Sequence, residues 1–467
     1  MHLTLSAVLA ALPVAKLHGL ADAAMELQTI STDSRSIESG SLFVALLGER
    51  FDAHDYLSQV AERGVKVAVV SRYQPDIKIT QIEVPDTLAA LGDLGRFWRR
   101  KFDFPVIAVT GSNGKTTVKE MIAAILQQAV GEVASLATRG NLNNEIGVPL
   151  TVFRLRQGHA LAVFELGMNH PGEIARLASI AQPTVALVNN AQREHQEFME
   201  SVAAVAAENG VVIHALPIDG TAVFPADDEF TSYWHEQAGQ RQVITFGLSN
   251  QATVWASDVH HDSAGQSHFM LHCGQQEATV VLNTLGEHNI RNALAAASCA
   301  LAAGVTIDKV VNGLEAFTPV KGRLQRHVLG HGAHGRILID DTYNANPDSV
   351  RAAIDVLVAT PAPHCLILGD MGEVGENGPQ FHQEVGVYAK AKGIEHFYCV
   401  GELTQYAAEA FGDSAHYFVD IESLNMALSE SILLARSLLV KGSRFMRMER
   451  VVELLKKQYD DHSVVSE

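Results

Sequence analysis

The chain has few cysteines, and none of them stands in a ligand or disulfide pattern. Its 467 residues include four cysteines, which are scattered and form no C-x-x-C pair: Cys273, Cys299, Cys365 and Cys399. Zinc sites and disulfide scaffolds need cysteines in pairs or at short spacing. The sequence therefore indicates a reducing compartment, and we expect a cytoplasmic protein.

Positive charge and long apolar runs are scarce as well. The formal net charge is -18 at pH 7, which disfavours nucleic acids and anionic membranes as partners, because both bind basic faces. No apolar stretch approaches the roughly 20 residues that a membrane-spanning helix needs. The short apolar run at the N-terminus lacks the basic segment of a secretory signal and fits a packed helix. We expect no nucleic-acid partner and no integral membrane contact.

A strand, a polar turn and a helix follow one another in residues 105–130, PVIAVTGSNGKTTVKEMIAAILQQAV. Such a unit aims backbone N–H groups and a helix N-terminus at one point, which suits a phosphate group. Lys115 would reach the terminal phosphates and the Thr116 hydroxyl would ligate magnesium. The favoured interpretation is an ATP or GTP site, although Val109 stands where the general phosphate-loop pattern has its first glycine. The predicted nucleotide-binding residues of this loop are Thr110, Gly111, Ser112, Asn113, Gly114, Lys115, Thr116 and Thr117.

The length and the order of apolar segments predict three domains. A chain of 467 residues exceeds the roughly 100 to 200 residues of one domain. Residues 1–100 alternate short strands and helices as in a small α/β domain, and residues 101–318 contain the phosphate loop. Residues 319–467 repeat strand and helix, which predicts a Rossmann-like, doubly wound domain. The predicted fold class is α/β throughout.

The strand pattern changes within the central domain. The apolar runs 106–109, 161–166 and 185–188 are nearly continuous, as in a parallel sheet that is covered on both faces. Between residues 219 and 285 the strands become short and alternating, which predicts an antiparallel extension. We therefore expect a P-loop ATPase-type parallel sheet that carries this extension.

Polar residues follow two of these apolar runs. Glu165 ends the run 161–166. It could cap a turn, but a phosphate loop in the same sheet favours a magnesium ligand. His195 lies beyond the run 185–188, where it is either a structural histidine or a second metal or phosphate contact.

Three other polar clusters leave alternatives open. Asn289 and Asn292 lie one turn apart at the start of a helix, where amides either read a base edge or cap the helix. Arg35 follows hydroxyl and acidic residues that either cap a turn or help to hold an anionic ligand. The histidines between 260 and 272 are joined by no acid or cysteine in a ligand pattern, which favours a solvated strand over a metal site.

Taken together, these stretches resemble the Mur ligases, ATP-dependent amide-bond-forming enzymes of peptidoglycan precursor synthesis. The resemblance covers essentially the whole chain, in order, through the motifs TDSR, SLFVALLGERFDAHDY, TGSNGKTT, TRGNLNNEIGVPLT, FELGMNHPGEI, GEHNIRNALAA, KGR, IDDTYNANPDS and LGDMGEVGE. The YNANPDS and GDMGEVG stretches resemble the branch that adds D-alanyl-D-alanine to UDP-N-acetylmuramoyl-tripeptide. The resemblance implies ATP and Mg2+ as cofactors, an acyl-phosphate intermediate, and a monomer whose substrates are UDP-MurNAc-tripeptide and D-Ala-D-Ala.

The resemblance also implies roles for individual residues. Ser34 and Arg35 of the first domain would bind the phosphates of the UDP group. Glu165 and His195 would contact the metal together with Thr116. The family's substrate loop would contain Asn141, Asn143, Asn144 and Glu145. The remaining nucleotide and substrate contacts would come, on closure of the third domain, from Asn289, Asn292, Arg323, Asp340, Tyr343, Asn344 and Asn346.

Two positions depart from the family pattern. Many relatives carry, in the helix after the histidine, a lysine read as carbamylated, whose carboxylate helps to hold a second metal ion. Here that position is Asn209, and no lysine occurs between Lys119 and Lys309. We hypothesise that Glu208 supplies a permanent carboxylate in its place and is a further catalytic residue. Ala53 stands where the family usually has glycine. This difference affects the conformation of one turn and does not change the class of protein.

Two other functions fit parts of the pattern. Folylpolyglutamate synthase has a similar central and C-terminal layout, but it would not need the first 100 residues. An ATP-driven switch would need the phosphate loop without the substrate motifs. Phosphate release that requires both UDP-MurNAc-tripeptide and D-Ala-D-Ala would distinguish the three functions. The resemblance fits a tripeptide that ends in either lysine or diaminopimelate.

Overall fold

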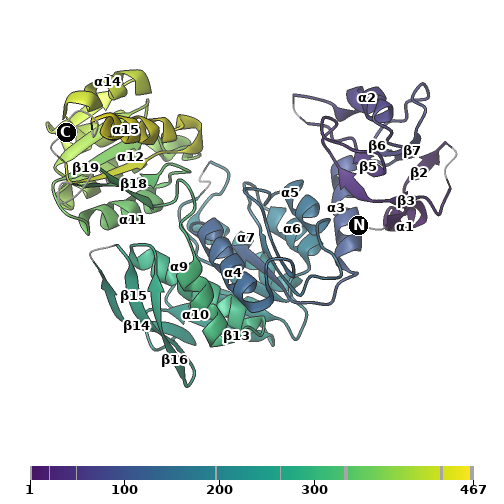
Figure 1. Cartoon of the computed structure of the whole chain (residues 1–467), viewed down its shortest axis with the longest axis horizontal. Helices are drawn as coiled ribbons and strands as arrows, with labels where there is room; N and C mark the ends of the chain where they lie inside the picture. Colours follow the sequence, from purple (N-terminus) through teal and green to yellow (C-terminus); the bar gives the residue numbers. More distant parts are fainter. Residues whose placement is uncertain are drawn as a thin grey trace.

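The computed structural model describes residues 3–19, 22–48, 50–194, 197–262, 265–330, 335–431 and 435–462. Figure 1 shows three α/β units, with the first and the third on either side of the central one. The predicted α/β class with three domains is confirmed. Within the described ranges, no helix is long and apolar enough to cross a membrane.

The first domain is built on a five-stranded sheet with the order β2–β7–β6–β5–β4. β2 pairs antiparallel with β7, and the other neighbours pair in parallel. The strands are β2 (Lys16–His18), β4 (Thr29–Ser31), β5 (Ser41–Val44), β6 (Val67–Val70) and β7 (Thr80–Glu83), with a separate pair β1 (Leu3–Thr4) and β3 (Glu26–Leu27). The helices are α1 (Leu5–Ala11) and α2 (Leu57–Glu62). Every residue of β5 and β6 is buried, which explains their nearly continuous apolar sequence.

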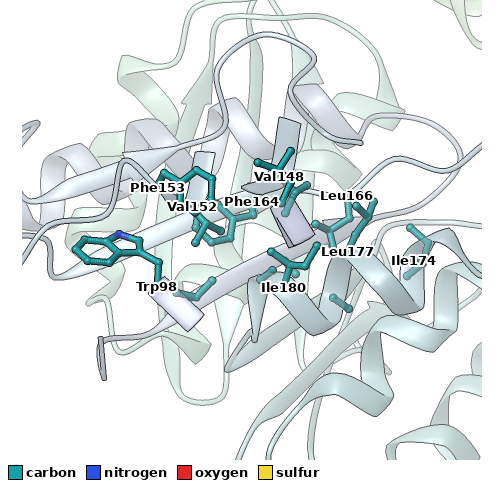
Figure 2. Close-up of a cluster of buried hydrophobic side chains, with 14 of the residues drawn as sticks. Trp98, Val148, Val152, Phe153, Phe164, Leu166, Ile174, Leu177 and Ile180 are labelled. Carbon is teal, nitrogen blue, oxygen red and sulfur yellow. The ribbon is translucent and has the colours of Figure 1, made fainter. Parts of the chain in front are cut away.

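Helix α3 (Thr87–Arg99) joins the first domain to the central one. Asp86 caps its N-terminus by accepting hydrogen bonds from the N–H groups of Leu88 and Ala89. One face packs against α5 (Gly147–Val152) and α6 (Glu173–Ala181) of the central domain. Figure 2 shows Trp98 of α3 in the same apolar cluster as Val148, Val152, Phe153 and Ile180. The apolar core therefore continues across the predicted boundary at residue 100.

The central domain holds a nine-stranded sheet with the order β16–β15–β14–β13–β12–β11–β8–β10–β9. Neighbours from β9 to β14 pair in parallel, and β14, β15 and β16 pair antiparallel. The strands are β8 (Val106–Thr110), β9 (Ser135–Ala137), β10 (Leu161–Glu165), β11 (Val185–Val188), β12 (Thr221–Pro225), β13 (Gln242–Gly247), β14 (Val254–His261), β15 (Ser267–Cys273) and β16 (Gln276–Leu282).

The antiparallel extension is shorter than the sequence predicted. β12 and β13 were expected to belong to it, but both are parallel strands, so this part of the prediction is wrong. The reason is the crossover helix α8 (Thr231–Ala238), which the short alternating pattern did not reveal. A helix between two strands returns the chain to the same end of the sheet and makes the strands parallel.

Helix α4 (Lys115–Val130) follows the phosphate loop and packs against both α9 (Glu287–Ala302) and α10 (Ile307–Ala316). A Cβ on Gly313 of α10 would lie 2.3 Å from Ile125 Cα of α4. Because this distance excludes any larger side chain, α4 and α10 touch through their backbones. On the other side of the sheet lies α7 (Val202–Gly210), followed by the 3-10 helix η2 (Val211–Ala215). The helix that carries the phosphate loop is thus held tightly on the sheet.

The third domain has a six-stranded sheet with the order β17–β18–β22–β19–β20–β21, in which β17 is antiparallel. The strands are β17 (Gln325–Leu329), β18 (Arg336–Asp341), β19 (His364–Gly369), β20 (His396–Val400), β21 (Ala415–Phe418) and β22 (Ser437–Lys441). One apolar cluster draws on α11 (Pro347–Val358), α12 (Gly378–Ala391) and α13 (Thr404–Phe411). The opposite cluster draws on α14 (Ile421–Ser431) and α15 (Glu449–His462). Helices on both faces of a mostly parallel sheet make the domain doubly wound, as predicted.

Candidate active site

A cavity of about 780 Å³ lies where the central and third domains meet. The phosphate loop, the segment after β9 and the end of β10 line one side of it. The loop between β18 and α11 lines the other side. The carboxyl ends of parallel strands from two sheets therefore converge on one space, which is where ligands bind in such folds.

The phosphate loop holds its shape through two glycines with positive φ. Gly111 has φ +129° and Gly114 has φ +80°. A Cβ on Gly114 would lie 2.5 Å from Asn292 Oδ1, and one on Gly111 would lie 2.9 Å from Asn189 Cβ. Both the backbone conformation and the close neighbours therefore require glycine.

Lys115 folds back over the loop. Its Nζ donates to the carbonyls of Gly111 (2.5 Å) and Ser112 (3.0 Å) and pairs with Glu194 Oε1 at 2.7 Å. The side chains of Lys115 and Glu194 are both largely buried. A buried cation needs a counter-charge, and Glu194 supplies it here.

Thr116 and Glu165 form the best candidate for a metal site. Thr116 Oγ1 donates to Glu165 Oε1 at 3.1 Å, and Asn143 Nδ2 donates to the same oxygen at 2.8 Å. Glu165 Oε2 is buried and has no hydrogen-bond partner within the described ranges. A carboxylate and a hydroxyl are hard oxygen donors, which suit magnesium, and a free carboxylate oxygen at the cavity fits such an ion.

His195, the other predicted metal contact, lies outside the described residues. Among the residues that are described, no group of three or more His, Cys, Asp or Glu side chains could hold a metal ion. Magnesium usually keeps several waters and binds substrate phosphates, so Thr116 and Glu165 could hold it without such a group. The same finding covers the described histidines of β14 and β15. His260 and His268 stack on each other at 4.9 Å, and His268 Nε2 lies 3.1 Å from Asp262 Oδ2.

The four predicted residues of the substrate loop, Asn141, Asn143, Asn144 and Glu145, all line the cavity. Asn144 Oδ1 accepts from Gly147 N at 2.8 Å and so shapes the start of α5. Ser34 and Arg35 are not part of the cavity lining. Arg35 is exposed and pairs with Asp33 at 2.9 Å, and this hydrogen bond lowers the pKa of Asp33 to about 2.

Asn289 and Asn292 also line the cavity, but their amides already have partners. Asn289 Nδ2 donates to Thr284 Oγ1 (3.0 Å) and to Leu285 O (2.8 Å). Asn292 Oδ1 accepts from Asn189 Nδ2 at 3.1 Å. The pair thus fixes the start of α9 against the phosphate loop.

The side chains of Arg323 and Asn346 connect the third domain to the phosphate loop. Arg323 Nη2 donates to Thr116 Oγ1 at 2.9 Å, and its guanidinium carbon lies 4.0 Å from the centre of the Tyr343 ring. Asn346 Nδ2 donates to Asn113 Oδ1 at 2.9 Å, while its Oδ1 caps α11. These contacts bring predicted residues from two domains together.

Asp340 and Asn344 serve the third domain itself. Asp340 is buried outside the cavity lining and accepts from Thr342 Oγ1 at 2.6 Å. Asn344 lines the cavity, and its carbonyl accepts from Lys441 Nζ at 2.9 Å. Lys441, which also pairs with Asp341 at 2.5 Å, was missed from the sequence, although it ends the apolar strand β22.

Arg193 was missed as well. Its guanidinium pairs with Asp348 of α11 at 2.7 Å and with Glu384 of α12 at 2.6 Å. The hydrogen bond to Asp348 is the main cause that raises the pKa of Arg193 above its ordinary value. The signal available in the sequence was its place directly after β11, two residues before His195.

Glu208 and Asn209 end helix α7 behind the phosphate loop. Asn209 Oδ1 accepts from Gly111 N at 2.9 Å, and its carbonyl accepts from Thr110 Oγ1 at 3.2 Å. Glu208 Oε1 accepts from Ile174 N, in the first turn of α6, at 2.9 Å. Neither side chain lines the cavity. For Glu208 to supply a carboxylate to the site, it would have to leave Ile174.

The fold and the site define a phosphate-loop protein whose ligand cavity is shared by two domains. Three domain families match the chain in order: the Mur ligase family, catalytic domain, over residues 26–99, the Mur ligase middle domain over 109–300, and the Mur ligase, glutamate ligase domain, over 322–444. The chain belongs to the Mur ligase family.

Individual relatives match over nearly the full length. The chain is 40% identical to the UDP-N-acetylmuramoyl-tripeptide–D-alanyl-D-alanine ligase of Haemophilus influenzae over 449 residues, 95% of this chain and 96% of the relative. The enzyme of the same name from Escherichia coli is 40% identical over 443 residues, 94% and 96% of the two chains. A crystal structure of MurF from Acinetobacter baumannii superimposes with a TM-score of 0.91 at 36% identity, covering 98% of this chain and 99% of that one.

Proposed function

We propose that this chain joins D-alanyl-D-alanine to UDP-MurNAc-tripeptide at the expense of ATP, giving UDP-MurNAc-pentapeptide, ADP and phosphate. The observation that carries the proposal is the cavity in which the phosphate loop of one domain meets Arg323, Tyr343 and Asn346 of the next. The names of the Haemophilus influenzae and Escherichia coli relatives, which the chain matches over more than nine tenths of its length, support the substrates.

Amide formation from a carboxylate is uphill in water, so the carboxylate first has to become an acyl donor. In this proposal the γ-phosphoryl group of ATP passes to the terminal carboxylate of the tripeptide. The amine of D-alanyl-D-alanine then attacks the acyl phosphate and phosphate leaves. Lys115 leaves Glu194 and binds the phosphates, where its charge stabilises the negative charge that develops during transfer.

Magnesium would be held by Thr116 and by the free oxygen of Glu165, with His195 as a further proposed contact. When bound, the ion neutralises charge on the phosphate oxygens. Asn143 keeps the carboxylate of Glu165 turned towards Thr116 through its hydrogen bond to Oε1. Glu208 contributes in this proposal by holding the first turn of α6 through Ile174.

The substrates would be bound by residues from all three domains. Ser34 and Arg35 would bind the UDP phosphates in the first domain, and the loop from Asn141 to Glu145 would lead the tripeptide to the phosphate loop. Asn289 and Asn292 would lie near the adenine, and Asp340 would support the closing loop of the third domain. An acyl phosphate hydrolyses readily, so closure of the third domain over the cavity protects it from water. We propose a monomer that acts in the cytoplasm.

The experiment is a phosphate-release assay on the purified chain with ATP, Mg2+, UDP-MurNAc-tripeptide and D-Ala-D-Ala, followed by mass analysis of the product. We expect release only when both substrates are present, and a product that contains the added dipeptide. Tripeptides ending in lysine and in diaminopimelate are assayed side by side. Release with folate and glutamate would instead support a folylpolyglutamate synthase, and release without any acceptor would support a nucleotide switch.

A further inference from the structure

The loop after β11 connects the phosphate loop to the third domain. Gln192 Oε1 accepts from Asn113 Nδ2 at 2.6 Å, and Glu194 Oε1 accepts from Lys115 Nζ at 2.7 Å. Arg193, between these two residues, contacts the third domain. Successive side chains of this loop therefore bind two different domains.

Arg193 makes an unusually complete set of contacts for a partly exposed side chain. Its Nη2 donates to Asp348 Oδ1 at 2.7 Å, and its backbone N–H donates to Asp348 Oδ2 at 3.0 Å. Its Nη1 donates to Glu384 Oε2 at 2.6 Å, and its guanidinium carbon lies 5.2 Å from the centre of the Phe381 ring. The side chain of Arg193 is 21% exposed and that of Asp348 is 24% exposed. Several short charged hydrogen bonds at a partly buried position are stronger than an ordinary surface pair.

The partners of Arg193 lie on two helices of the third domain, and one of them, α11, lines the cavity. Asp348 belongs to the first turn of α11, and the residue that caps this helix, Asn346, donates to Asn113 of the phosphate loop. The loop that leads into α11 carries Tyr343 and Asn344, which line the cavity. Glu384 and Phe381 lie on α12 and extend the same contact. Arg193 itself does not line the cavity.

We propose that Arg193 is a positioning residue for the ligation reaction: through Asp348 it fixes α11 over the phosphate loop, and through Glu384 it holds α12 beside α11. It touches none of the reacting groups and acts through the loop that carries Tyr343, Asn344 and Asn346. This inference rests on the proposed function. It predicts that nucleotide binding to the phosphate loop and the rate of the reaction respond differently when Arg193 is changed.

The test compares the full-length protein with the variants Arg193→Ala and Arg193→Lys. The matched control is Lys392→Ala, because Lys392 forms an ion pair with Asp355 at 2.6 Å inside the third domain. Four quantities are measured: kcat of phosphate release, affinity for a non-hydrolysable ATP analogue, the radius of gyration by small-angle X-ray scattering, and the thermal unfolding midpoint. The last measurement verifies that each variant is folded.

We expect Arg193→Ala to lower kcat by about ten- to a hundredfold, while the affinity for the analogue changes by less than about threefold. The radius of gyration of Arg193→Ala with the analogue should exceed that of the unchanged protein, because the third domain is no longer held. Arg193→Lys keeps the charge without the forked geometry and should recover part of kcat. Lys392→Ala should leave all four quantities unchanged.

Three results would overturn the inference: a kcat of Arg193→Ala within about twofold of the unchanged protein, a parallel loss of analogue affinity, or an equal fall in the Lys392→Ala control. If Arg193→Ala fails to fold, Arg193→Lys decides by the same criteria. If the unchanged protein releases no phosphate with both substrates, the proposed function fails instead. The scattering comparison then still tests whether Arg193 holds the third domain against the central one. An equal radius of gyration for Arg193→Ala and the unchanged protein rejects that role of Arg193.

Discussion

Thr116 donates a hydrogen bond to one carboxylate oxygen of Glu165, and the other oxygen of that carboxylate is buried without a partner within the described ranges. An unpaired buried carboxylate oxygen is costly unless a cation or a donor completes it. A bound magnesium ion would supply that partner. The pair is therefore the place where metal dependence should be tested first.

We expect Glu165→Gln to lower kcat of phosphate release by about a hundredfold or more and to raise the Mg2+ concentration needed for half-maximal rate, because an amide oxygen binds the ion weakly. Calorimetric titration of Mg2+ into the protein with an ATP analogue gives a readout that does not depend on turnover. The matched control is Glu132→Gln, an exposed glutamate of the same domain. If the Mg2+ requirement of Glu165→Gln is unchanged, the carboxylate only stabilises the loop and does not bind the ion.

The second prediction concerns Asn209 and carbamylation. Carbamylation requires a lysine amine and carbon dioxide, and the chain has no lysine between Lys119 and Lys309. The Asn209 side chain instead accepts from Gly111 N at the start of the phosphate loop. We therefore expect the rate of phosphate release to stay the same when bicarbonate is removed or added. A rate that rises with bicarbonate in the unchanged protein would show that another group is carbamylated.

The same contact predicts the effect of changing Asn209. Asn209→Leu removes the acceptor and leaves the buried N–H of Gly111 without a partner, which typically costs about 1–3 kcal/mol. We expect kcat/KM for ATP to fall by about tenfold, since the loop loses its fixed shape. Asn209→Asp, which keeps an acceptor oxygen, serves as the comparison and should lose less. Equal values for the two variants would show that the Gly111 contact is unimportant.

The sequence predicted the buried strands of this protein well and its domain contacts poorly. β11 has the predicted bounds, because it is framed by polar turns and every one of its residues is buried. β17 and β21 were missed, since both lie at sheet edges and keep most of their side chains at least partly in contact with solvent. Neither edge strand carries a continuous apolar run.

In the candidate site, too, the sequence predicted residues in local patterns and missed contacts between domains. Lys115, Thr116 and Glu165 were found because each follows an apolar strand in a local pattern that has a physical meaning. Arg193 and Asp348 are 155 positions apart and belong to different domains, so no local pattern joins them. Such contacts depend on how two domains meet, which composition and spacing do not encode.

A fourth prediction uses the close packing of α4 and α10. A Cβ on Gly313 would overlap the backbone of Ile125, which belongs to the helix after the phosphate loop. Overpacking of this kind costs about 1–3 kcal/mol, and 1 kcal/mol shifts the melting temperature of a domain of this size by about 2–4 °C. We expect Gly313→Ala to lower the thermal midpoint by several degrees. The control is Asn312→Ala on the exposed side of α10, and an equal midpoint for both variants would contradict the packing argument.

His382 makes the stability of the third domain depend on pH. Its Nε2 accepts from Met371 N at 3.0 Å, so the ring proton sits on Nδ1 and donates to Gly378 O at 2.7 Å. Burial lowers the pKa of His382 below its ordinary value of 6.5. A second proton, on Nε2, would place the N–H of the ring against the N–H of Met371. This repulsion disfavours the charged ring and agrees with the lowered pKa of His382. Burial lowers the pKa of His288 in the same way.

The pKa of such a histidine is lower in the folded protein than in the unfolded chain, so the unfolded chain binds more protons once the pH drops below about 6.5. The free energy of unfolding therefore decreases as the pH is lowered, by up to about 1.4 kcal/mol per pH unit for each such group. We expect the thermal midpoint to fall between about pH 7.5 and about pH 5.5. In His382→Gln, whose amide keeps a donor and an acceptor but does not titrate, the fall should be smaller, the remainder coming from groups such as His288. Parallel pH profiles for the variant and the unchanged protein would show that His382 is not the titrating group.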